Sequence, residues 1–317
     1  MKIRVGITMG DPSGIGPEII AAALPVIAGP SAVTVIGDAW VFQKASSRCR
    51  LPGGLSYDFV EMGNVPRKGF SFGKVRKEYG AASLEYVDFA LLLLKRGIID
   101  CLVTCPVSKE SVSLGKRGFS GHTEYLSEKS GARATVMMLL NRQLKFGMVT
   151  NHLALKEVPS RVSRERIIET SLVTAAALRN NFAVRRPKLV CCGLNPHASD
   201  HGLFGKEERS ALAPALAVLR KKGILIDGPL PADTACYRAY GGEYDAVIAM
   251  YHDQALIPLK LTGAESGVNF TAGLPFVRTS PLHGTAFDIA GKGRASAASL
   301  IAAVETARTC CLNLRKA

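Results

Sequence analysis

The sequence contains no uninterrupted apolar run of the roughly 18 residues that a membrane helix requires. It also lacks the features of a signal peptide, because residues 1–9 lead through a short apolar strand directly into the turn GDPSGIGP. We therefore expect a cytoplasmic protein with no membrane partner. Hydrophobic residues make up 47% of the 317 positions, which is enough for a large core and, at about 150 residues per domain, for two domains.

Metal-binding pairs of cysteine are also absent, because none of the eight cysteines forms a Cys-x-x-Cys motif. A zinc site held by cysteine is therefore not expected. In a cytoplasmic chain of this size we expect reduced thiols that are mostly buried in the core.

Aromatic residues are few, and tryptophan occurs only once. Positive charge is in excess, since 40 Lys and Arg against 26 Asp and Glu give a net charge of +14. Proteins that bind single-stranded nucleic acid combine basic residues with aromatic side chains that stack on the bases. Here the basic residues are scattered, so we expect no nucleic-acid partner. The charge indicates a small anionic ligand or a solvated surface.

Short apolar runs alternate along the chain with longer patterns of helical periodicity. The expected strands are residues 4–9, 32–36, 101–104, 134–140, 145–150, 188–192 and 246–250. The expected helices are residues 17–28, 81–96, 164–181, 206–222 and 295–312. This alternation predicts an α/β fold with a largely parallel sheet.

A glycine-rich turn, MGDPSGIGPEII at residues 9–20, follows the first expected strand and opens the first expected helix. Pro17 suits the first turn of a helix, and Gly14 and Gly16 permit the close approach of a ligand. The turn matches neither the dinucleotide fingerprint G-x-G-x-x-G nor a Walker loop. By itself the spacing therefore favours an ordinary turn between strand and helix over a ligand site.

A second segment, PLHGTAFDIAGKG at residues 281–293, lies near the other end of the chain. Together the two segments resemble the isocitrate and isopropylmalate dehydrogenases. That resemblance implies two α/β/α domains around a central cleft, without a Rossmann domain, and NAD as cofactor with NADP as an alternative. It assigns cofactor contacts to Gly14, Gly16, His283, Gly284, Thr285 and Asp288.

Three of the six histidines follow expected strands at short distances. His152, His197 and His252 come just after residues 145–150, 188–192 and 246–250. If these strands belong to one parallel sheet, their carboxyl ends share an edge and the three imidazoles can converge there. Three histidines with one open position form a common catalytic zinc site, although imidazole also suits cobalt, nickel and iron. Each histidine taken singly is also compatible with a hydrogen bond to the backbone at the end of its strand.

A closer resemblance rests on motifs that occur in order between residue 5 and about residue 305. They are GDPSGIGPE, GFSGHTEYLSE, VTNHLAL, GLNPHAS, GPLPADT, MYHDQALIPLK, GVNFTAGLPFVRTS and HGTAFDIAGKG. With these motifs the chain resembles the 4-hydroxythreonine-4-phosphate dehydrogenase family of vitamin B6 biosynthesis. The resemblance implies oxidation of a small phosphorylated substrate by NAD, followed by loss of CO2 to give 3-amino-2-oxopropyl phosphate.

The same resemblance implies one divalent metal, zinc in the first place, with magnesium or cobalt as alternatives. It assigns the metal to His152, His197 and His252, and implies a homodimer whose partner subunit contributes His252. Asp233 and Asp253 are expected beside the metal ligands. Substrate contacts are assigned to His122, Thr123, Lys260, Asn269 and Arg278.

Three serines depart from the pattern expected of this family, namely Ser108, Ser113 and Ser266. Two alternative substrate classes therefore stay open: a four-carbon phosphorylated sugar acid, such as phosphothreonate or phosphoerythronate, and an aromatic cis-dihydrodiol carboxylate. A protein that binds a metal or a nucleotide without catalysis is the alternative from another class. The complete histidine trio weighs against that alternative.

Two expectations concern the architecture of the site. We expect residues 1–121 and 283–317 to form a domain on the cofactor side, and residues 122–282 to form the dimerising domain that binds metal and substrate. We also expect Pro258 to prevent a regular helix between His252 and Lys260. An extended segment would separate the backbone positions of these two residues by up to about 25 Å.

Overall fold

The computed structural model describes residues 2–47 and 53–316. It divides into two compact units, residues 1–131 with 275–315 (unit 1) and residues 132–274 with 316–317 (unit 2). The first boundary lies after Gly131 rather than before His122, so helix α5 (His122–Ser130) belongs to unit 1. The reason is local packing, because the Tyr125 hydroxyl of α5 donates to Asp88 of helix α3 at 2.7 Å. His122 and Thr123 therefore lie outside the domain in which we expected them.

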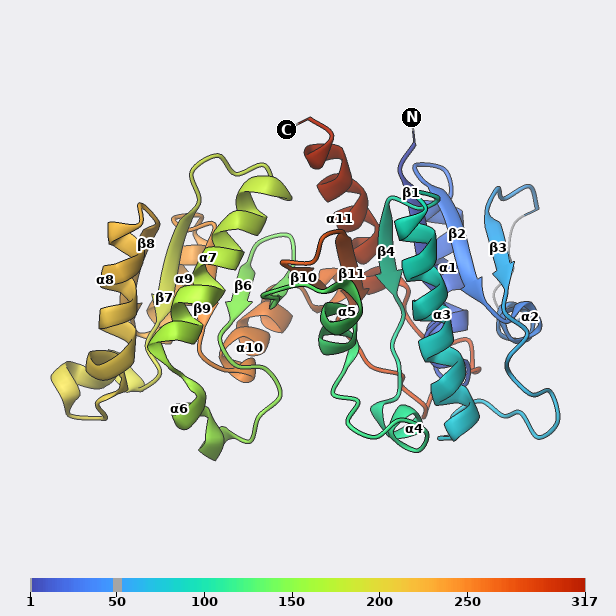
Figure 1. Cartoon of the computed structure of the whole chain (residues 1–317), viewed down its shortest axis with the longest axis horizontal. Helices are drawn as coiled ribbons and strands as arrows, with labels where there is room; N and C mark the ends of the chain where they lie inside the picture. Colours follow the sequence, from blue (N-terminus) through green and yellow to red (C-terminus); the bar gives the residue numbers. More distant parts are fainter. Residues whose placement is uncertain (1, 48–52, 317) are drawn as a thin grey trace. The chain divides into compact units, whose positions relative to one another are not determined.

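Unit 1 is a parallel sheet covered by helices (Figure 1). Its strands are β1 (Arg4–Thr8), β2 (Ala32–Gly37), β3 (Asp58–Glu61), β4 (Cys101–Thr104) and β11 (Val277–Pro281), in the order β3-β2-β1-β4-β11. Its helices are α1 (Gly16–Ile27), α2 (Ala39–Ser46), α3 (Lys77–Lys95), α4 (Lys109–Ser113), α5 and α11 (Ala298–Leu314). The chain runs from β1 to β2 on one side of β1, and it later returns to β4 on the other side of β1. The carboxyl ends of β1 and β4 therefore form a topological switch point.

Helices cover both faces of the sheet in unit 1. Right-handed crossovers that run in opposite directions across the sheet place α1 and α3 on opposite faces. α11 packs on β11, β4 and α1, whereas α3 packs on β1, β2 and β4. The central strands are accordingly buried on both sides, with Ile7, Val35 and Val103 fully inaccessible.

Unit 2 has a mixed sheet with the strand order β10-β5-β6-β9-β7-β8 (Figure 1). The strands are β5 (Val136–Leu140), β6 (Lys145–Met148), β7 (Lys188–Cys192), β8 (Leu225–Leu230), β9 (Ala246–Ala249) and β10 (Val268–Ala272). β6, β9, β7 and β8 are parallel, while β5 pairs antiparallel with both β10 and β6. The expected parallel sheet is thus found in unit 1 and in the part of unit 2 that carries the histidines.

The helices of unit 2 are α6 (Val158–Arg161), α7 (Arg164–Asn180), α8 (Ala213–Lys221), α9 (Ala232–Tyr240) and α10 (His252–Gly263). A π-helical turn, Glu208–Leu212, leads into α8. α7 and α8 pack together over one core, in which Ile167, Leu216 and Ile248 are fully buried. The connection from β8 through α9 to β9 crosses the sheet in the direction opposite to the connection from β6 through α7 to β7. Because both crossovers are right-handed, α9 lies on the face opposite to α7.

The seven expected strands and five expected helices are all present, with ends that shift by a few residues. The sequence reading missed β3, β8, β10, β11, α2, α4, α5, α6, α9 and α10. No helix within residues 2–47 and 53–316 has the length and apolarity needed to span a membrane. The seven described cysteines are free thiols and only Cys236 is not fully buried, while Cys49 lies outside the described residues.

The expectation for Pro258 is wrong, because α10 runs through this residue from His252 to Gly263. A proline inside a helix removes one backbone hydrogen bond, but here packing and side chains compensate. Leu259 is fully buried, and its carbonyl accepts a hydrogen bond from Asn141 Nδ2 at 2.9 Å. The Thr262 hydroxyl donates to the carbonyl of Pro258 at 2.8 Å.

Candidate functional site

The three predicted metal ligands follow three neighbouring parallel strands of unit 2. β9 lies between β6 and β7, and His152, His252 and His197 come within a few residues of the carboxyl ends of β6, β9 and β7. The rings of His152 and His252 lie close together, with 5.4 Å between their centroids and 42° between their planes. The sheet therefore brings two of the three histidines together.

His252 is the first residue of α10, and its ring is held by its neighbour. The Nδ1 atom lies 2.7 Å from Asp253 Oδ1. A carboxylate on one ring nitrogen keeps the other nitrogen available as a ligand, which is the usual arrangement around metal-binding histidines. Asp253 thus contacts one of the predicted metal ligands, whereas Asp233 is exposed in the first turn of α9.

Gln254 joins the ends of the strands on which these histidines depend. Its Oε1 accepts from the backbone N–H of Met250 at 2.7 Å, and its Nε2 donates to the carbonyl of Gly193 at 2.8 Å. The Thr150 hydroxyl donates to the carbonyl of Met250 at 2.6 Å. The carboxyl ends of β6, β9 and β7 are therefore connected by buried side chains. The sequence reading missed Gln254, although it stands two residues after His252 in the motif MYHDQ.

His197 lies on a strained segment. Residues 197–201 all have left-handed backbone angles, with φ between 43° and 70°, and none of them is glycine. Such angles cost roughly 1–2 kcal/mol per residue, so the surrounding structure must impose them. Glu208, which is 4% exposed, accepts from the backbone N–H groups of Leu194 and Asn195 at 2.9 and 2.8 Å and anchors the start of the segment. The segment leaves His197 and His201 exposed.

The described part of the chain does not contain a complete metal site. No group of three or more His, Cys, Asp or Glu side chains is placed there to hold a metal ion. The rings of His152 and His252 lie together, and Asp253 contacts His252 alone. His197 does not join them and is exposed, with 6.4 Å between its ring centroid and that of Phe204. A zinc site takes at least three protein ligands, so the pair alone is not sufficient.

Unit 2 also carries two of the predicted substrate residues. Lys260 is exposed on α10, eight residues after His252, which corresponds to about 12 Å along a helix axis. Asn269 lies on β10, and its buried side-chain oxygen has no hydrogen-bond partner among the residues that the structure describes.

The other three predicted substrate residues lie in unit 1. Arg278 on β11 is 1% exposed and donates to the Thr104 hydroxyl at 2.6 Å. Burial lowers the pKa of Arg278 to about 10, against the opposing effect of Glu124, so the guanidinium stays charged at neutral pH. Burial and the nearby Arg278 lower the pKa of His122 well below its ordinary value, so His122 is neutral. The Thr123 that follows it in α5 is also buried.

The two predicted cofactor segments lie against each other in unit 1. The backbone N–H of Ile15 donates to the carbonyl of Thr285 at 3.0 Å. A Cβ atom added to Gly14 would lie 3.1 Å from that same oxygen, and one added to Gly16 would collide with the carbonyl of Met9. In this structure the two glycines thus make room for protein backbone, whereas we expected them to admit a ligand.

Glu18 holds the second cofactor segment in place. It is 2% exposed, and its carboxylate accepts from the backbone N–H groups of Gly291 and Ala295, both at 3.0 Å. His283 Nδ1 lies 3.2 Å from the carbonyl of Gly284, and burial lowers the pKa of His283. Gly284 and Asp288 are exposed. The sequence reading missed Glu18, although it stands in the motif GDPSGIGPE.

Comparison with known proteins covers nearly the whole chain. The family model described as "Pyridoxal phosphate biosynthetic protein PdxA" matches residues 31–307. A 4-hydroxythreonine-4-phosphate dehydrogenase from Desulfosudis oleivorans is 41% identical over 334 aligned positions, covering 99% of this chain and 98% of that protein. The chain belongs to the PdxA family.

Other PdxA-family relatives extend this result. A D-threonate 4-phosphate dehydrogenase from Cupriavidus necator is 39% identical and covers 95% of each chain. The crystal structure of a 4-hydroxythreonine-4-phosphate dehydrogenase from Klebsiella pneumoniae superposes with a TM-score of 0.88 at 35% identity, covering 98% of both chains. The predicted family and the α/β fold class are therefore confirmed.

Proposed function

We propose that this chain oxidises 4-(phosphooxy)-L-threonine with NAD and releases CO2 and 3-amino-2-oxopropyl phosphate, in the biosynthesis of pyridoxal 5′-phosphate. The observation that carries the proposal is the full-length similarity to 4-hydroxythreonine-4-phosphate dehydrogenases. The α/β architecture, with polar side chains at the carboxyl ends of parallel strands, agrees with a ligand site at those ends.

The reaction has two steps, an oxidation and a decarboxylation. The carbon that bears the secondary alcohol gives a hydride to the nicotinamide while its hydroxyl loses a proton, which yields a β-keto acid. The carboxylate carbon then leaves as CO2, and the electron pair of the broken bond forms an enolate that is protonated. The residues proposed for this site must therefore bind a phosphate and a carboxylate and stabilise negative charge on oxygen.

Unit 1 offers donors with the required character. Arg278 is a buried guanidinium that remains charged, and it can bind an anion through two parallel hydrogen bonds. His122 is neutral because of burial and the neighbouring cation, and its buried Nε2 has no hydrogen-bond partner among the described residues. We assign both residues to the substrate, together with Thr123, and we assign Lys260 to the phosphate as a point charge.

Metal dependence and dimerisation are part of the proposal. We assign one divalent ion, zinc in the first place, to His152, His197 and His252, with His252 contributed by the partner subunit of a homodimer. The support is the position of the three histidines after neighbouring parallel strands and the contact of His252 with Asp253. A divalent ion bound there would stabilise the alkoxide and the enolate oxygen.

The test is steady-state NADH formation with three substrates: 4-(phosphooxy)-L-threonine, D-threonate 4-phosphate and unphosphorylated 4-hydroxy-L-threonine. We expect kcat/KM to be at least about tenfold higher for the first substrate than for either of the others. Lys260→Ala should lower that value at least about tenfold, which corresponds to about 1.4 kcal/mol. Lys221→Ala, which changes another exposed helical lysine of unit 2, is the matched control and should have no effect. A preference for D-threonate 4-phosphate would refute the proposed substrate.

A further inference from the structure

Lys109 is an exposed cation of unit 1 that has no role in the site as described so far. It is the first residue of α4 and follows the carboxyl end of β4, at the topological switch point of the sheet. Within residues 2–47 and 53–316, Lys109 takes part in no ion pair. Its charge is therefore available to a ligand at the edge of the sheet where ligands of α/β proteins bind.

Buried polar groups fix the backbone around Lys109. The Ser108 hydroxyl caps α4 by accepting from the backbone N–H of Ser111 at 3.0 Å, and Ser108 is 6% exposed. The carbonyl of Pro106 accepts from the backbone N–H of Asp11 at 2.9 Å, which ties the segment to the turn after β1. Ser108, which departs from the pattern expected of the family, thus serves as a helix cap. The exposed lysine has a rigid attachment.

The side chain of Lys109 reaches the amino end of α5. Gly121 precedes this helix, and a Cβ atom added to Gly121 would lie 3.5 Å from Lys109 Cε and 3.8 Å from Nζ. The first backbone N–H groups of a helix have no partner within the helix and carry partial positive charge, so they attract anions such as phosphate. Lys109 adds a full positive charge beside this helix end.

Three residues that we assign to the substrate stand at the same helix end. His122 is the first residue of α5, and its buried Nε2 has no hydrogen-bond partner among the described residues. Thr123 follows it and is buried. Arg278 lies near enough to contribute to the lowered pKa of His122. An unpaired buried polar atom between cations indicates a place for a ligand that completes its hydrogen bonds.

Glu124 is the carboxylate that faces these cations. Its Oε2 would lie 3.1 Å from the same added Cβ atom at Gly121, and its charge raises the pKa of Arg278 against the effect of burial. Glu124 is exposed and forms no ion pair within the described chain. It therefore opposes the binding of an anion, and its removal should strengthen that binding.

The phosphate of the proposed substrate suits these cations better than the carboxylate does. The carboxylate leaves as CO2, so cations that stabilise it before the reaction would raise the barrier to its departure. The phosphate does not react. Binding energy from such a remote group orients the reacting carbon and can be used to accelerate the reaction.

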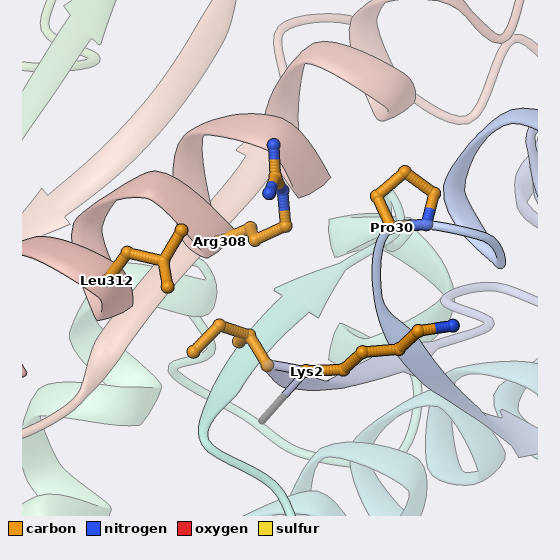
Figure 2. Close-up of a pocket in the computed structure, with 5 residues that line it drawn as sticks. Lys2, Pro30, Arg308 and Leu312 are labelled. Atoms are coloured by element: carbon orange, nitrogen blue, oxygen red, sulfur yellow. The ribbon is translucent and has the colours of Figure 1, made fainter.

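A cavity at the opposite edge of the sheet of unit 1 does not offer an equivalent site. It has a volume of about 320 Å³ and is lined by Lys2, Ile3, Pro30, Arg308 and Leu312 (Figure 2). Ile3 precedes β1 and Pro30 precedes β2, so the cavity lies at the amino ends of these strands. Pro30 follows the end of α1 and Leu312 lies in the last turn of α11, and the carboxyl ends of helices disfavour anions.

We propose that Lys109 is a further substrate-binding residue, which holds the phosphate at the amino end of α5 together with Thr123 and Arg278. The proposal rests on the proposed function, because that function supplies the phosphorylated substrate. Lys109 acts as a point charge, whereas the buried Arg278 guanidinium offers paired donors in a fixed direction.

The test measures the binding of inorganic phosphate to the full chain, without substrate, cofactor or turnover. A phosphorus NMR titration gives the Kd of phosphate. We expect Lys109→Gln to raise this Kd at least about fivefold, and added sodium chloride to weaken binding to the native chain, because salt screens exposed charges. Lys109→Arg keeps the cation and should stay within about threefold of the native Kd. Glu124→Gln should lower the Kd about threefold, because it removes the opposing charge.

The matched control is Lys95→Gln, which removes another exposed lysine of unit 1. Lys95 lies at the end of α3, which leads into the amino end of β4, whereas Lys109 follows the carboxyl end of that strand. The control should keep the Kd of phosphate within about twofold of the native value. All four variants change exposed residues, so their urea midpoints should match that of the native chain. An unchanged Kd for Lys109→Gln would overturn the proposal, and so would an equal loss in the control.

These outcomes are separable from failure of the proposed function. If Lys109→Gln weakens phosphate binding but the native chain oxidises none of the three substrates, Lys109 remains a phosphate-binding residue and the proposed reaction is lost. If the native chain oxidises 4-(phosphooxy)-L-threonine and Lys109→Gln leaves both its KM and the Kd of phosphate unchanged, only the present proposal is lost.

Discussion

Replacing Thr104 by valine tests the buried hydrogen bond that supports Arg278. The substitution keeps the shape of the side chain but removes the hydroxyl that accepts from Arg278 Nη2 at 2.6 Å. Thr104 is fully buried and Arg278 is 1% exposed, so water cannot replace the lost acceptor. A hydrogen bond to a charged group contributes about 1.5–3 kcal/mol, and we therefore expect unit 1 to lose about 2 kcal/mol of unfolding free energy.

The chain offers a matched control at the adjacent position of the neighbouring strand. Thr8 on β1 is the register partner of Thr104 on β4 and is equally buried. Within the described chain, however, the Thr8 hydroxyl has no hydrogen-bond partner. Replacing an unbonded buried hydroxyl by a methyl group removes a desolvation cost, so Thr8→Val should be neutral or stabilising by up to about 1 kcal/mol.

Urea denaturation followed by the fluorescence of Trp40 measures both effects, because the only tryptophan lies in unit 1. With a slope of about 2 kcal/mol per molar urea, the midpoint for Thr104→Val should fall by about 1 M. The midpoint for Thr8→Val should stay unchanged or rise. If both substitutions lower the midpoint equally, the hydrogen bond is not the cause and the reasoning is refuted.

Three further predictions address the site. Gln254→Leu removes both hydrogen bonds that join Met250 to Gly193. It should lower kcat at least about tenfold without changing the KM for NAD. Gln254→Glu should recover part of the loss, because a carboxylate can still accept from the Met250 N–H. Glu18→Ala releases the 283–295 segment and should raise the KM for NAD several-fold with a smaller effect on kcat; an unchanged KM would contradict this assignment. Because the pKa of His122 is lowered in the folded chain, only the unfolded chain gains a proton there below about pH 6.5, so stability falls as the pH falls. The urea midpoint of unit 1 should drop between about pH 7 and pH 5, and His122→Asn should reduce that drop.

The sequence by itself determined the elements whose signals are local. Apolar runs such as 101–104 and 188–192 coincide with strands because a strand buried on both faces needs hydrophobic residues throughout. The placement of His152, His197 and His252 after parallel strands was also predicted, because each histidine stands a few residues after an apolar run. Family membership was readable because its motifs are contiguous in sequence.

Only the tertiary structure decided how distant residues support one another. α10 continues through Pro258 because the burial of Leu259 and the hydrogen bond from Asn141 outweigh the loss of one backbone bond, and neither contact is visible in the local sequence. His122 joined unit 1 through the packing of its helix on α3. The supporting roles of Glu18 and Thr104 depend on partners more than 170 positions away. Such pairings are set by the order of strands in the sheet, which residue periodicity does not specify.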